Sequence, residues 1–152
     1  MRTQASVLLS LLLPCVAVAE EPQLPSAGSP ICIWEIYVAL INHAEICRLD
    51  VGSDMHAAME ESVAEVRRFI ADNSETTEEF LDSQRAKRLI RQRNNYRAAL
   101  NDNGVDMCDR SANEAVSNLY RHTMTDQSPD ELRVWIKRFV SVPRDPRLGY
   151  CL

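Results

Sequence analysis

Apolar residues recur every three to four positions along most of the chain, which is the spacing of an amphipathic α-helix. The first such segment begins just after Pro30 and is expected to end at about Cys47. Its apolar positions extend over a wide sector of the helix, which is typical of a central helix that is buried on most sides. No segment shows the period of two that indicates a β-strand. The pattern predicts an all-α protein.

Helix-start signals then indicate a second and a third helix. Ser53 is the expected N-cap of a helix over about Asp54–Ala71. Thr76 and Glu79 form a capping box, in which hydroxyl and carboxylate each accept a hydrogen bond from a free backbone amide. This third helix is expected to run to about Asp102, because the Asn-Gly pair that follows favours a left-handed end.

Two further start signals lie in the C-terminal part. Ser111 with Glu114 is a second capping box, and it predicts a fourth helix that ends at about Thr123. Ser128-Pro129-Asp130-Glu131 combines an N-cap, a first-turn proline, an Asp that favours the helix dipole and a Glu that closes a capping box, so it predicts a fifth helix. The apolar residues of that helix should face inward: Leu132, Trp135, Ile136, Phe139 and Val140. From Val142 onward, two prolines and a glycine predict an extended strap.

The N-terminal residues 1–19 have the features of a secretory signal peptide. Arg2 precedes an apolar stretch, and Ala17 and Ala19 supply the small residues that a signal peptidase accepts. We therefore expect cleavage near Ala19 and a periplasmic or secreted protein.

The mature chain is expected to be one domain. Residues 20–30 are rich in proline, serine and glycine, which predicts a flexible lead-in. Residues 31–152 have the length of a single domain. The expected fold is a compact bundle of about five helices, stapled by two disulfides.

Four cysteines remain after the signal segment: Cys32, Cys47, Cys108 and Cys151. An even number in an exported chain indicates disulfides. Cys32 and Cys47 lie at opposite ends of the first helix, about 22 Å apart at 1.5 Å per residue, so they cannot pair. Two pairings remain. We favour Cys32–Cys151 with Cys47–Cys108 over Cys32–Cys108 with Cys47–Cys151.

Charge and hydropathy narrow the class of partner. The chain has 17 basic and 22 acidic residues, a net charge of −5. A mildly acidic protein is not expected to bind nucleic acid or an anionic membrane as its main task. After the signal segment, no apolar run approaches the roughly 20 residues of a transmembrane segment. The expected partner is another protein.

Motifs for catalysis, metal or cofactor binding are missing. The chain has no His-Glu-x-x-His, Gly-x-Ser-x-Gly or Cys-x-x-Cys sequence. His56 and Glu60 lie four residues apart and His43 could approach them, but a solvated and structural role explains them better. No cofactor, metal or catalytic residue is predicted.

One basic cluster stands out in this acidic chain. No acid occurs between Asp82 and Asp102. A helical wheel places Lys87, Arg88 and Arg91 together, away from the apolar residues of the third helix, with Arg85 beside them. The simplest interpretation is a solvated helix face, and the functional one is a patch that docks an acidic partner or an anionic ligand.

Arg93 and Arg97 fall within the apolar sector on the same wheel. A guanidinium in such a place must reach water or meet a carboxylate. The expected partner is one of three acids: Glu61, Glu65 or Glu35. The alternative is an anion-binding pocket that Arg93 and Arg97 form with three neighbours: Asn94, Asn95 and Tyr96.

The cysteine layout loosely resembles that of exported immunity proteins of the Tai type. However, the segment that follows Cys47 reads RLDVGSD and lacks the Gly-Tyr-Ile sequence of that family. The chain is therefore assigned to no family.

These observations favour a non-catalytic protein-interaction module in the periplasm or medium. One alternative is a small-molecule or lipid carrier with an apolar cavity between helices. The other is a cell-envelope enzyme of unfamiliar type.

Overall fold

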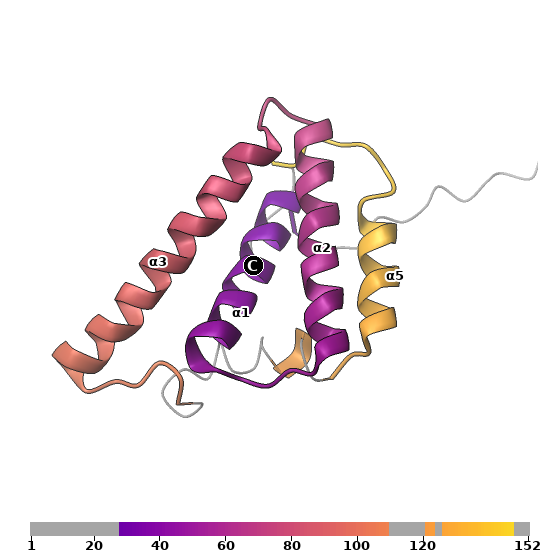
Figure 1. Ribbon diagram of the computed structural model, residues 1–152. Helices are drawn as coiled ribbons and strands as arrows, with labels where there is room; N and C mark the ends of the chain where they lie inside the picture. Colours follow the sequence, from indigo (N-terminus) through magenta and orange to yellow (C-terminus); the bar gives the residue numbers. More distant parts are fainter. Residues whose placement is uncertain (1–27, 110–120, 124–125, 148–152) are drawn as a thin grey trace, which may run out of the picture.

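A computed structural model describes residues 28–109, 121–123 and 126–147 of the protein. Within these residues the chain is helical and contains no strand, so the all-α prediction is confirmed (Figure 1). The helices are α1 (Pro30–Cys47), α2 (Ser53–Asp72), α3 (Glu78–Asn103) and α5 (Pro129–Phe139). Residues 121–123 are also helical. The signal segment, most of the lead-in and the start of the expected fourth helix lie outside the described residues.

Helix α1 lies at the centre of the fold. It packs between α2 and α3, and α5 packs on the other side of α2 (Figure 1). The predicted stripes meet here, because the buried side chains of α1, α2 and α5 form one core cluster. Its fully buried members include Val38, Ala58, Met59, Val66, Leu132 and Phe139.

By length and composition alone, α1 is apolar enough to cross a membrane, and it is the one such helix among the described residues. In the folded protein, 61% of it is buried against the other helices. A core helix passes the same test as a membrane span, so the burial of α1 explains its apolar sequence.

The ends of α1 and α5 lie where local signals predict them. Ser29 caps α1 by accepting a hydrogen bond from the backbone amide of Cys32, and Pro30 is its first residue. At α5, Ser128 and Glu131 form the predicted capping box. Because a proline at the first turn loses no helical hydrogen bond, both helices begin at one.

Two predicted caps are displaced by one residue. Gly52, not Ser53, is the N-cap of α2, and no side chain caps that end. Thr77, not Thr76, caps α3, with its hydroxyl accepting from the amide of Phe80. Thr76 and Thr77 offer the same capping hydroxyl, so the sequence pattern does not separate them, and Gly52 is itself among the residues common at an N-cap. The predicted end of α3 is close to the observed one, because Gly104 adopts the left-handed conformation with φ 65°.

A disulfide joins Cys47 at the end of α1 to Cys108 in the segment after α3, with Cα atoms 5.4 Å apart. This half of the favoured pairing is confirmed, and the alternative that joins Cys32 to Cys108 is wrong. Cys151 lies outside the described residues. In Figure 1, α3 leans away from α1 toward its C-terminal end, and the disulfide ties the following segment back to α1.

Helix α3 differs from the other helices, because Leu81 is its one buried residue. Ile90 and Leu100 are 60% and 52% exposed, respectively. Apolar side chains at these two positions are thus exposed to solvent instead of packed in the core. The apolar residues of α3 are spread around the helix, so they do not define a face.

Candidate functional site: a polar groove between α1 and α3

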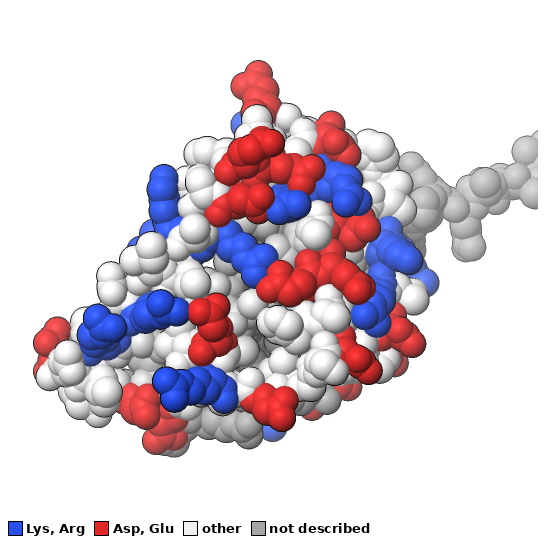
Figure 2. Space-filling view, in the orientation of Figure 1, with Lys and Arg blue, Asp and Glu red and all other residues white. Residues whose placement is uncertain are grey.

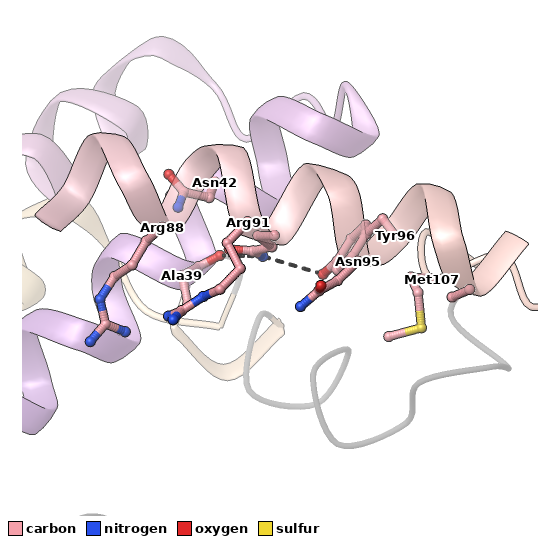
Figure 3. A pocket seen from close by; sticks show the side chains of 9 residues that line it. Ala39, Asn42, Arg88, Arg91, Asn95, Tyr96 and Met107 are labelled. Carbon is pink, nitrogen blue, oxygen red and sulfur yellow. Dashed lines mark hydrogen bonds between the residues drawn. The ribbon is translucent and has the colours of Figure 1, made fainter.

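A groove of about 400 Å³ lies between α1 and α3 and continues to the segment after α3. We call it the α1–α3 groove. Nine residues line it: Ala39, Asn42, Arg88, Arg91, Gln92, Asn95, Tyr96, Ala99 and Met107. None of the nine is acidic, although the protein as a whole is acidic. In Figure 3, the side chains of Arg88, Arg91 and Asn95 extend to the same side of α3.

Polar contacts fix α3 against α1. Arg88 forms an ion pair with Glu35 of α1, and its guanidinium lies 5.9 Å from the centre of the Trp34 ring. Gln92 Nε2 donates a hydrogen bond to the backbone oxygen of Ala39, at 3.1 Å. These contacts select the face of α3 that meets α1, because its apolar residues are too scattered to do so.

A chain of hydrogen bonds crosses the floor of the groove. Gln92 Nε2 donates to the hydroxyl of Tyr96 at 3.3 Å, and that hydroxyl lies 2.7 Å from His43 Nδ1. An amide nitrogen can only donate, so the Tyr96 oxygen accepts from Gln92 and its proton is directed at His43. Burial lowers the pKa of His43, which is consistent with a neutral ring that accepts at Nδ1. The Sγ atom of Cys47 lies 3.7 Å from the same nitrogen.

One donor in the groove lacks a partner. Asn42 is 2% exposed, and its Nδ2 atom has no hydrogen-bond partner in the described structure. A buried donor without an acceptor costs about 1–3 kcal/mol. Nearby, Arg91 and Asn95 are exposed, and Arg91 forms no ion pair with any described residue. The lining of the groove therefore contains one buried donor without an acceptor, and the exposed side chains of Arg91 and Asn95.

The four residues of the predicted basic patch do not share one face. Arg85 binds the carboxylate of Glu60 through two hydrogen bonds of 2.8 and 2.6 Å, and this pairing lowers the pKa of Glu60. Arg88 faces α1, as described above. Lys87 and Arg91 are exposed. Basic and acidic groups are intermixed over the face shown in Figure 2, so the face has no extended basic area.

Arg93 forms an ion pair, but with a partner other than those expected. Its Nη2 atom lies 2.9 Å from Glu45 of α1. The three expected partners bind other arginines: Glu35 binds Arg88, Glu61 binds Arg133, and Glu65 lies near Arg68. Arg97 is exposed. Asn95 and Tyr96 do line a pocket, but with Arg88 and Arg91 instead of Arg93 and Arg97.

The histidines and acids considered for a metal site do not come together. His43 points to Tyr96 of α3, whereas His56 is exposed on α2 near Glu60. Within the described ranges, no group of three His, Cys, Asp or Glu side chains is placed to hold a metal ion.

Four aromatic residues lie in the core or beside it: Trp34, Tyr37, Trp135 and Phe139. Trp34 and Tyr37 are buried, and Trp135 packs against the core and stacks on Phe139. Their rings fill space between helices and do not line the α1–α3 groove.

The sequence interpretation missed Asn42, Gln92 and the inward position of Arg88. One signal for Asn42 was present, since it is an uncharged amide within the most apolar helix of the chain. Polar groups in such a place usually have a partner or a function. For Gln92 and Arg88 no such signal exists, because their places depend on how α3 packs.

The buried His43 predicts acid sensitivity. An unfolded histidine titrates near pH 6.5 and the folded His43 has a lowered pKa, so below that pH the unfolded chain binds a proton more readily. The contribution of neutral His43 to the free energy of unfolding should therefore be fully present above about pH 6.5. It should decrease as the pH falls below that value. His43→Gln keeps an acceptor for Tyr96 but cannot be protonated, so it should reduce this decrease, as measured by urea unfolding across the acidic range.

The matched control is His122→Gln, because His122 is exposed. That variant should keep the acid sensitivity of the wild type. Equal pH dependence of the wild type and His43→Gln would show that His43 is not the group responsible.

No protein-family model, no curated protein and no solved structure matches the chain. The case for a function therefore rests on the geometry of the groove.

Proposed function

We propose that this protein is an exported, non-catalytic interaction module of the periplasm or medium. It binds a partner protein through the side of α3 that exposes Lys87 and Arg91 and borders the α1–α3 groove. The signal-like residues 1–19 support export, and so does the Cys47–Cys108 disulfide, because disulfides persist in oxidising compartments.

A second disulfide between Cys32 and Cys151 belongs to this proposal. The backbone amide of Ile31 donates to the carbonyl of Pro146 at 3.2 Å, so the C-terminal strap passes beside the start of α1. Five further residues reach to Cys151 and span at most about 17 Å when extended. The strap is thus long enough for Cys151 to meet Cys32.

The observation that most supports a binding role is the set of unused donors at the groove. Asn42 Nδ2 is buried without an acceptor, and Arg91 is exposed without an ion pair in the described residues. Elsewhere on the surface, most arginines with described contacts pair with acids of the same chain. The exposed guanidinium of Arg91 is therefore suited to an acceptor from another molecule.

The test is affinity capture of the mature protein from its own organism, with wild type compared to Lys87→Glu/Arg91→Glu. Both side chains are exposed and without described ion pairs, so the variant should fold normally, as circular dichroism can verify. We expect wild type to retain a specific partner and the variant to lose it, because the reversed charges repel an acidic surface.

The matched control is Arg97→Glu, which reverses an exposed charge elsewhere on α3. It should retain the partner. If the double variant captures the same protein as wild type in equal amount, the proposed binding surface is wrong.

A further inference from the structure

We infer that the α1–α3 groove binds a carboxylate side chain from an acidic segment of the partner protein. This inference rests on the proposed function and assigns the chemical group that is recognised. Three properties of the groove support it: its charge, its unused donors and its fixed shape.

The groove has cationic groups and no compensating acid in its lining. Arg91 has no ion pair within the described residues. Arg88 makes its ion pair with Glu35 through Nη2, and a guanidinium has five N–H donors. Arg88 and Arg91, on two adjacent turns of α3, therefore both have N–H donors that no described ion pair uses. Because the whole chain has a net charge of −5, an acidic segment would be repelled from most of the surface.

The unused donors require a ligand that accepts hydrogen bonds. Asn42 Nδ2 is buried and can only donate, so a cation or another donor would leave it unsatisfied. A carboxylate accepts at both oxygens, and its planar shape matches the guanidinium fork. In this proposal it accepts from the exposed guanidinium of Arg91, in a groove that Asn42 and Asn95 also line.

The walls of the groove are held in place before any ligand enters. Gln92 is fixed by its bond to the Ala39 oxygen, and Tyr96 by its contacts with Gln92 and His43. Met107 lines the end of the groove and immediately precedes Cys108, which the disulfide fixes to α1. A site arranged in advance loses less conformational entropy on binding.

The test is titration of the isotope-labelled mature protein with acetyl-Glu-Glu-amide, followed by NH correlation spectra. The side-chain amide resonances of Asn42 should shift, together with backbone resonances of α3 near Arg91. Single carboxylate contacts are weak, so binding in the millimolar range is expected. Acetyl-Gln-Gln-amide, which has the same shape without charge, should cause no comparable shift.

Two variants localise the site. Arg91→Gln should weaken acetyl-Glu-Glu-amide binding by about tenfold or more, since charge-assisted hydrogen bonds are the strong ones. Arg97→Gln, on an exposed part of the same helix, should bind as wild type. Raising the salt concentration should weaken binding to wild type, because ions screen an exposed pair.

Several outcomes would overturn the inference. They are equal shifts with the Gln-Gln peptide, unchanged binding by Arg91→Gln, or shifts that map away from the groove. Inorganic phosphate is the further probe. If phosphate saturates the Asn42 resonances and the Glu-Glu peptide does not, the groove takes a free oxyanion and not an acidic side chain.

The two proposals can fail separately. If Lys87→Glu/Arg91→Glu loses its partner but the Glu-Glu peptide does not bind wild type, the groove inference is wrong and the interaction surface stands. If the peptide binds and the double variant still captures its partner, the groove binds a carboxylate, but the proposed interaction surface and the assignment of that carboxylate to the partner are wrong.

Discussion

Replacing both Cys47 and Cys108 by alanine should lower the free energy of unfolding by about 4 kcal/mol. The disulfide joins residues 61 positions apart, so it restricts a long loop of the unfolded chain. Both cysteines are only half-buried, so their loss leaves little cavity in the core. Urea unfolding of the oxidised wild type and the double variant measures the difference.

A reductant provides the control for this experiment. It should destabilise the wild type by at least as much as the double substitution does, because it opens the same loop. A loss below about 1 kcal/mol in the double variant would contradict the chain-entropy argument. The variant should also show weaker acetyl-Glu-Glu-amide binding, since the segment with Met107 is no longer tied to α1.

Phe139→Ala should cost about 3–5 kcal/mol, the usual range for removing a buried aromatic ring. Phe139 is fully buried, and its ring stacks on Trp135 with centroids 5.0 Å apart. The guanidinium of Arg144 lies 4.6 Å from the same ring and donates a hydrogen bond to the Phe139 carbonyl. The substitution thus leaves a cavity, and it removes the ring that Arg144 of the C-terminal strap contacts.

Val134→Ala is the matched control on the same helix, since Val134 is 57% exposed. It should change stability by no more than about 0.5 kcal/mol. Thermal or urea unfolding distinguishes the two variants directly. If Phe139→Ala were as stable as Val134→Ala, α5 would not be part of the core.

Apolar periodicity and capping residues correctly predicted several helices and helix ends. α1 ends at Cys47 as predicted, and α5 begins with the predicted capping box. The apolar residues of α2 are buried at helical spacing, from Met55 to Ile70. These features depend on residues within one or two turns of each other, so the sequence alone contains the needed information.

The pairing of Cys47 with Cys108 required both the sequence and the tertiary structure. Helix length excluded the pairing of Cys32 with Cys47, because the rise per residue is fixed. The choice between the two remaining pairings depended on where the end of α3 lies relative to α1. That position follows from packing between distant segments, which the spacing of cysteines does not encode.

The candidate site shows more clearly what the sequence could not predict. The sequence identified the basic residues of α3 but treated them as an exposed group. In the structure, Arg85 and Arg88 turn toward Glu60 and Glu35, residues 25 and 53 positions away, respectively. Because the apolar residues of α3 are few and scattered, these long-range ion pairs decide which face is buried.

By itself, the sequence determined the helical class, the approximate helix boundaries and the location of the positive charges, because each depends on local periodicity and composition. Only the tertiary structure decided that α3 meets α1 through polar side chains. It also placed Asn42, Arg88 and Arg91 along one groove. The physical reason is that a groove is made by two surfaces, and their mutual orientation is set by contacts between residues far apart in the chain.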